Sequence, residues 1–246
     1  MRVTRTDIMG MPITIDIPHA SDEALFDAAF GRFTEIDQRF STYKDDSEIS
    51  RFNRGEIPES ELSSEMRDIF ALAERTKKDT NGYFDIRHPD GSLDPSGVVK
   101  GWAILEVAKL LSARGAHDFM VDAAGDIATS GVNEEGKEWT IGIRSPFDQE
   151  TVVKVVHPRG KGIATSGSYI RGAHIYNPHD PSRSLDEVVS LTVIGPDVLE
   201  ADRYATAAFA MGKEGISFIA TLPGFEGYAV DTHGTATMTP GFPAYA

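Results

Sequence analysis

The segment 197–212, DVLEADRYATAAFAMG, constrains the fold of this chain more than any other. Asp197 is followed three residues later by Glu200, the spacing of a capping box at a helix start. Gly212 suits the left-handed position that ends a helix. Between these caps, apolar residues at helical spacing predict a stripe that packs on other elements, namely Ala201, Ala205, Ala208 and Phe209.

Two polar residues interrupt this helix, and they allow two interpretations. Asp202 and Thr206 lie four residues apart, so their side-chain oxygens leave the same helix face. A carboxylate beside a hydroxyl offers hard oxygen ligands to a divalent cation. Alternatively, the aspartate is solvated and the threonine bonds to its own helix. Taken alone the pair favours this second interpretation, because such pairs are common on helices.

The remaining apolar patterns indicate an α+β protein. Alternating or continuous apolar runs predict strands at 13–17, 83–86, 119–121, 139–144, 152–157, 161–169, 188–194, 227–230 and 235–238. Helical spacing predicts helices over 21–40, 63–80, 98–114 and 214–222, with a polar, turn-rich loop at 40–56. Because strict β-α-β alternation is missing, we expect helices packed on mixed or antiparallel sheets, in a single domain spanning 1–246.

Composition excludes several classes of function. The formal net charge is −14 and no run of Lys and Arg offsets it, which argues against nucleic-acid and anionic-membrane partners. A polyanionic cofactor would need a metal ion or a focused basic residue. The chain has no cysteine, so disulfides, thiol nucleophiles and zinc–thiolate sites are excluded. The sequence lacks a signal peptide pattern and an apolar stretch long enough for a membrane span, so we expect a cytoplasmic protein.

Glycine-rich turns at 94–101, 122–126 and 164–167 are candidates for ligand contact. The first places Gly97 before a helix with Lys100 in its first turn, an arrangement that suits a phosphate group. It lacks Walker A spacing, and the chain has neither a Rossmann GxGxxG nor a GxSxG nucleophile elbow. His174 is either a general base or a hydrogen-bonded structural histidine.

Seven stretches occur in one order along the chain: FSTYKDDSEISRFN, GYFDI, DPSGVVKG, DAAGDI, ATSGSY, HIYNP and EADRYATAAFAMG. In this order they resemble the FAD:protein FMN transferases of the ApbE family. The resemblance implies an ApbE-like fold with two intertwined subdomains around a central flavin site. It also implies magnesium-dependent transfer of FMN from FAD to a Ser or Thr hydroxyl of an acceptor flavoprotein, with release of AMP.

The resemblance assigns roles to individual residues. Side-chain ligands of Mg²⁺ would be Asp202 and Thr206, and main-chain carbonyls would come from Gly97 and Ala205. His174 matches the histidine that activates the acceptor hydroxyl, which makes the expected catalytic residues His174, Asp202 and Lys100. Residues matching FAD contacts are Met9, Tyr43, Tyr83, Phe84, Asp85, Asp94, Lys100 and Ile175.

At three positions within these stretches, the chain departs from the family pattern. Asn177 stands where the family commonly has Asp, and the NAGGD-like turn contains Asp122 and Ala124 in place of Asn and Gly. Two alternatives stay open: an FAD pyrophosphatase, which would use water at the same site and yield FMN and AMP, and a non-catalytic FAD-binding or carrier protein, which the Asn177 departure leaves open.

Overall fold

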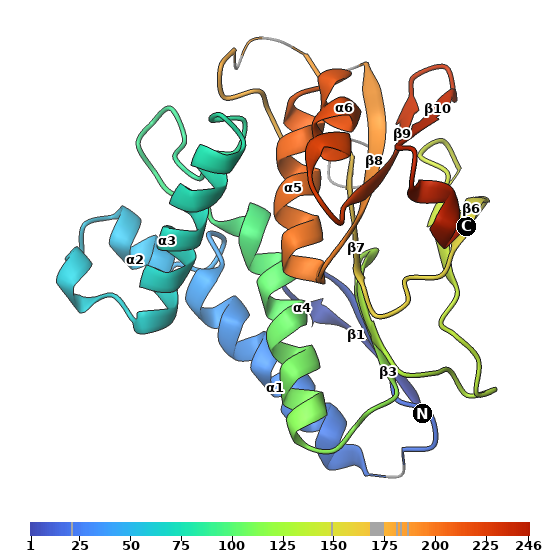
Figure 1. Ribbon diagram of the computed structural model, residues 1–246. Coiled ribbons are helices and arrows are strands. Elements are labelled where there is room, and N and C mark those ends of the chain that lie inside the picture. Colours follow the sequence, from blue (N-terminus) through green and yellow to red (C-terminus); the bar gives the residue numbers. More distant parts are fainter. Residues whose placement is uncertain (21, 149, 168–174, 181, 183, 186) are drawn as a thin grey trace.

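The computed structural model describes residues 1–246 apart from 21, 149, 168–174, 181, 183 and 186 (Figure 1). Its centre is an antiparallel sheet in the order β1-β2-β3-β4-β7-β8-β9-β10. These strands are Arg2–Ile8, Met11–Asp16, Phe119–Ala123, Asp126–Ser130, Gly162–Gly167, Val188–Gly195, Glu226–Asp231 and Ala236–Met238. The predicted α+β class is therefore confirmed.

Helices cover one face of this sheet, and a small second sheet covers the other (Figure 1). The helices are α1 (Glu23–Phe40), α2 (Glu48–Asn53), α3 (Ser64–Asp79), α4 (Ser96–Ala113), α5 (Val198–Ala210) and α6 (Glu214–Thr221). The second sheet pairs β5 (Ile141–Arg144) with β6 (Val152–Val156), as predicted. Alternation along β3 separates the two sides, since Val121 packs with the helices and Met120 with the small sheet.

Among the described residues, β4 and β7 share the fewest paired residues of any neighbouring strands in the central sheet. These strands are paired through Ile127 and Ile163, whereas β7 and β8 are paired along the full length of β7. Strands before this junction come from the first part of the chain and strands after it from the last part. Helices α4 and α5, which belong to different parts, pack against each other beside the junction.

Helix α5 forms as its sequence predicts. The Asp197 carboxylate accepts the Glu200 N–H at 2.9 Å, and Gly212 has a φ of +66° after the last turn. The carboxylate of Glu200 accepts from Arg203 rather than completing the predicted capping box within the described contacts. The predicted helices at 63–80, 98–114 and 214–222 and the hairpin at 227–238 are also confirmed.

Two local predictions were wrong. The loop expected at 40–56 contains α2, which Ser47 caps by accepting the Ser50 N–H at 3.1 Å. Residues 83–86 do not form a strand, because the Thr80 hydroxyl accepts the Phe84 N–H at 3.2 Å. The helix predicted over 21–40 is confirmed as α1, which Asp22 caps; Ser21 lies outside the described residues.

Strands β1 and β4 were not predicted. Six of the seven residues of β1 are polar or only partly shielded at the sheet edge, so the strand carries no clear apolar alternation. Within the described residues, no helix combines the length and apolarity that crossing a membrane requires.

A buried guanidinium joins α5 to α3. Arg203 is 4% exposed, and its Nη atoms donate to Asp79 Oδ2 at 3.2 Å and to Glu200 Oε2 at 2.6 Å. It also contacts the Tyr204 hydroxyl at 3.0 Å. Burial opposes the positive charge, but the hydrogen bonds and charge interactions with Glu200, Tyr204 and Asp79 together outweigh it, so the pKa of Arg203 is raised.

We expect Arg203→Met to lower the free energy of unfolding by about 3 kcal/mol, because it leaves partly buried carboxylates without their cation. Chemical denaturation measures this loss. The matched control is Arg114→Met, at an exposed position after α4, which should change stability by less than about 0.5 kcal/mol. If both substitutions lowered the free energy of unfolding by a similar, small amount, the contacts of Arg203 would not be important for stability.

Candidate active site

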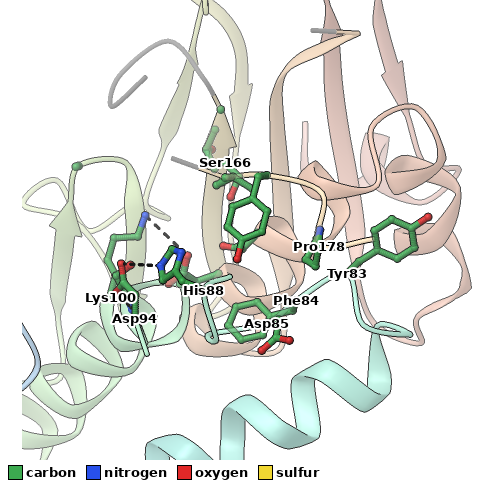
Figure 2. Close-up of a pocket in the computed structure, with 17 residues that line it drawn as sticks. Tyr83, Phe84, Asp85, His88, Asp94, Lys100, Ser166 and Pro178 are labelled. Carbon is green, nitrogen blue, oxygen red and sulfur yellow. Dashed lines mark hydrogen bonds and ion pairs between the residues drawn. The ribbon is translucent and has the colours of Figure 1, made fainter. Parts of the chain in front are cut away.

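A pocket opens where the start of α4, the end of β7 and one face of α5 meet the loops around 83–88 and 175–178 (Figure 2). Many residues that the sequence singled out lie together in its lining: Tyr83, Phe84, Asp85, Asp94, Gly97, Lys100, Ile175, Asp202 and Thr206. They come from distant parts of the chain, so the fold brings them together. His88, Ser166, Tyr176 and Pro178 also line the pocket and were not predicted.

Close packing of α4 on α5 forms the floor of the pocket. The Gly101 N–H donates to Asp202 Oδ2 at 2.8 Å. A Cβ atom at Gly101 would lie 2.7 Å from Asp202 Cβ and 2.9 Å from the Val198 carbonyl oxygen, which is too close for any larger residue without rearrangement. The small residues of both helices therefore allow an approach that places the Asp202 carboxylate beside the main chain of α4.

One lysine and two aspartates form a charge cluster on this floor. Lys100 Nζ lies 2.6 Å from Asp126 Oδ2 and 3.8 Å from Asp202 Oδ1. Asp126 is fully buried, and its other oxygen accepts the Thr165 N–H at 3.0 Å. Asp126 was missing from the predicted site residues, although it ends the DAAGD turn. The sequence marked Asp126 only as the last residue of a glycine-containing turn, and in the structure it begins β4.

The environment of Asp202 makes its negative charge costly. Burial raises the pKa of Asp202 to about 8; the Lys100 ammonium opposes this rise, and the Asp126 carboxylate adds to it. A carboxyl group with this pKa carries a proton at neutral pH unless a further cation lies next to it. The floor of the pocket is thus suited to a ligand that brings positive charge.

The donor atoms of the floor fit Mg²⁺. Asp202 and Thr206 both line the pocket from neighbouring turns of α5, and Gly97 lines it from α4. Ala205 is fully buried and is not part of the lining, so only its carbonyl could contribute. Among the described residues no three His, Cys, Asp or Glu side chains cluster as metal ligands. Mg²⁺ takes few protein ligands and completes its shell with water and phosphate oxygens, which agrees with this donor set.

Tyr83, Phe84 and Tyr176 line the pocket near the charge cluster, and together they form an aromatic wall. Phe84 is buried, whereas Tyr83 and Tyr176 are partly exposed to the pocket. Asp85 forms an ion pair with Lys77 Nζ at 2.6 Å, and Asp94 accepts a hydrogen bond from the Ser96 N–H at 3.0 Å. Aromatic faces next to fixed carboxylates suit a planar, polar ring system together with its sugar hydroxyls.

Two predicted residues lie outside the pocket lining, and a third lies outside the described residues. Tyr43 is 97% exposed and Met9 lies in the turn between β1 and β2, and neither belongs to the pocket lining. Their assignment as FAD contacts therefore stays a prediction. His174 lies outside the described residues.

The positions that depart from the family pattern have structural roles. Asn177 is buried, and its Oδ1 accepts the His179 N–H at 2.9 Å, which closes a local turn. Asp122 Oδ1 accepts the Gly125 N–H at 2.8 Å, and burial raises the pKa of Asp122. Ala124 has a φ of +52°, a left-handed conformation that favours glycine.

We expect Ala124→Gly to raise the free energy of unfolding by about 1 kcal/mol, because the left-handed conformation costs alanine roughly that amount. Thermal or chemical denaturation measures the gain. Ala71→Gly, in the exposed middle of α3, is the matched control and should lower stability by about 1 kcal/mol. A loss of stability at both positions would contradict the strain assigned to Ala124.

Solved structures share this fold. A flavin transferase ApbE from Vibrio cholerae superimposes with a TM-score of 0.85 at 24% identity, covering 100% of this chain and 99% of that one. The ApbE protein from Thermotoga maritima gives a TM-score of 0.85 at 19% identity, covering 100% of this chain and 98% of that one.

Sequence comparison also finds relatives of this chain. An FAD:protein FMN transferase from Klebsiella pneumoniae (strain 342) is 27% identical, over 92% of this chain and 82% of the relative. The enzyme of the same name from Escherichia coli (strain K12) is 28% identical, over 82% of this chain and 75% of the relative. The sequence pattern of the ApbE family matches residues 9–88 and 87–229. On these matches and on its fold, the chain belongs to the ApbE family of transferases.

Proposed function

We propose that this protein transfers FMN from FAD to a Ser or Thr hydroxyl of an acceptor flavoprotein, with Mg²⁺ bound and with AMP as the leaving group. The observation that carries the proposal is the charge cluster of Lys100, Asp126 and Asp202 at the start of α4. A pyrophosphate needs both positive charge and a cation-binding carboxylate nearby, and this floor supplies them beneath an aromatic wall.

Each group of residues contributes one part of the reaction. Asp202 and Thr206 would hold Mg²⁺ through their side chains, and Gly97 and Ala205 through their carbonyls. When bound, the ion would neutralise charge on the pyrophosphate oxygens. Lys100 would bind the pyrophosphate by its ammonium group, helped by the N–H groups at the start of α4. Tyr83, Phe84 and Ile175 would pack against the flavin and fix its orientation.

The chemical step exchanges one phosphorus–oxygen bond for another. The acceptor hydroxyl oxygen attacks the phosphorus atom on the FMN side of the pyrophosphate, and the bond to the bridging oxygen breaks. AMP leaves with that oxygen, and the hydroxyl proton passes to a base. The resemblance assigns this base to His174. An acceptor protein must therefore place its hydroxyl at the pocket, where the aromatic wall and the charged floor meet.

Incubation of the purified protein with FAD, Mg²⁺ and an acceptor flavoprotein tests the proposal. We expect mass spectrometry to find FMN attached to a Ser or Thr of the acceptor, together with AMP in equal amount. Chelation of Mg²⁺ should stop the reaction. Thr206→Ala should slow it by about tenfold or more, because a metal ligand is lost. Thr221→Ala, an exposed threonine at the end of α6, is the matched control and should react normally.

The same experiment separates the alternatives. Release of AMP in the absence of acceptor, at the rate seen in its presence, would indicate an FAD pyrophosphatase. Tight FAD binding without release of AMP under any condition would indicate a carrier. An acceptor that stays unmodified although FAD and Mg²⁺ are bound would refute the transferase.

A further inference from the structure

Two pocket-lining segments, 83–88 and 175–178, are held together by a residue outside the lining. His179 follows the second segment, and its side chain contacts the turn that precedes the first. Figure 2 shows Tyr83 and Pro178 next to each other on one side of the pocket. Since the segments lie about ninety residues apart in the sequence, their relative position depends on such contacts.

Among the described residues, the imidazole of His179 contacts Asn81 by a hydrogen bond and Tyr83 by a ring contact. His179 Nε2 lies 2.9 Å from the Asn81 carbonyl oxygen, and because a carbonyl only accepts, Nε2 carries the proton. The ring also packs edge-on against Tyr83, with 4.6 Å between ring centroids and an interplanar angle of 71°. Gly82 makes room for this contact, since a Cβ atom there would lie 3.2 Å from His179 Cε1.

The chain around His179 is arranged to present the ring in this direction. The His179 N–H is held by Asn177 Oδ1 at 2.9 Å, and the Asp180 N–H by the Asn177 carbonyl at 3.1 Å. This turn leaves Pro178 on the pocket side while His179 points to the 81–83 turn. Asn177, a departure from the family pattern, therefore supports the placement of His179.

A second contact joins the same segments further along. The rings of His88 and Tyr176 lie 5.8 Å apart between centroids, and the Tyr176 hydroxyl lies 3.5 Å from the Arg87 carbonyl oxygen. These contacts are longer than those of His179. Among the described contacts between these parts of the chain, those of His179 are therefore the shorter.

We propose that His179 is a positioning residue: it fixes Tyr83 against the 175–178 segment, so that the aromatic wall is already formed when FAD binds. The inference rests on the proposed function, because it names FAD as the ligand. A wall that is ordered in advance binds a rigid ring system more tightly, since less side-chain freedom is lost on binding.

The test compares His179→Leu, which removes the donor and the ring, with His179→Gln, whose Nε2 can still donate to the Asn81 carbonyl. Titration of FAD against each protein, followed by flavin fluorescence, gives the dissociation constant. We expect His179→Leu to weaken FAD binding about tenfold and His179→Gln about threefold. His233→Leu, on the exposed β9–β10 turn, is the matched control and should bind FAD like the wild type.

Hydrogen exchange of the FAD-free proteins gives an independent measurement. The amides of 81–88 should exchange faster in His179→Leu than in the wild type, and at nearly the wild-type rate in His179→Gln. Unchanged FAD affinity in His179→Leu would overturn the inference, whatever the exchange shows. If the wild type itself failed to bind FAD, the proposed function would be refuted, and the exchange rates would still decide whether His179 holds the two segments together.

Discussion

Asp202→Asn should reduce the rate of FMN transfer by about a thousandfold or more. The asparagine side chain keeps the size and the acceptor for the Gly101 N–H but removes the negative charge that would bind Mg²⁺. A metal ion at a transferring phosphate contributes several kcal/mol to the transition state, and each 1.36 kcal/mol corresponds to about tenfold in rate. The measurement is the initial rate of AMP release at saturating FAD and acceptor.

The fold should survive this substitution. Burial disfavours the charged carboxylate, so a neutral amide at the same place should leave the metal-free protein at least as stable at pH 9 or so. The matched control Asp68→Asn, on the exposed face of α3, should change neither rate nor stability. A slow variant that is also largely unfolded would show that Asp202 acts through the packing of α4 on α5.

Mg²⁺ affinity should rise steeply with pH up to about 8. The raised pKa means that Asp202 holds a proton at neutral pH, and this proton must leave before the carboxylate binds the ion. The apparent association constant should therefore increase about tenfold per pH unit below pH 8 and level off above it. Calorimetric titration of FAD-free protein with Mg²⁺ between about pH 6 and pH 9 measures this dependence, with Asp202→Asn as the variant that should lose it.

The same shift predicts how the metal-free protein responds to pH. Because the pKa of Asp202 is higher in the folded than in the unfolded chain, the folded state binds more protons between about pH 4 and pH 8. The contribution of this group to stability is complete below pH 4 and is lost as pH rises towards 8. An affinity for Mg²⁺ that did not change with pH would contradict the protonated carboxyl group.

Local signals in the sequence were sufficient to predict α5, whereas the assignment of Asp202 and Thr206 to a site came from the family resemblance. Asp197 and Gly212 act within one helical turn of the helix ends, and Asp202 and Thr206 share a face because of helix geometry alone. The close approach to α4 also follows from residue size, since alanines and Gly101 leave room for it.

Asp126 could not be recognised in the same way. Its partners are Lys100 and Thr165, and both reach it only after β4, β7 and α4 have taken their places in the fold. The error at 83–86 has a local cause: the apolar spacing resembles a strand, but the Thr80 hydroxyl, four residues earlier, accepts the Phe84 N–H. Helix α2 was missed because its six residues are too few for an apolar stripe.

Because β4 and β7 share few main-chain pairs, the pocket residues help to hold the two parts of the sheet together. Main-chain bonding between the two parts of the sheet is sparse at Ile127 and Ile163. The hydrogen bonds between Asp126 and Thr165 and between Gly101 and Asp202 join the same two parts of the chain. The candidate site therefore also connects these two parts. A ligand bound by residues from both parts would stabilise the contact between them, and the two parts would then unfold together as one unit.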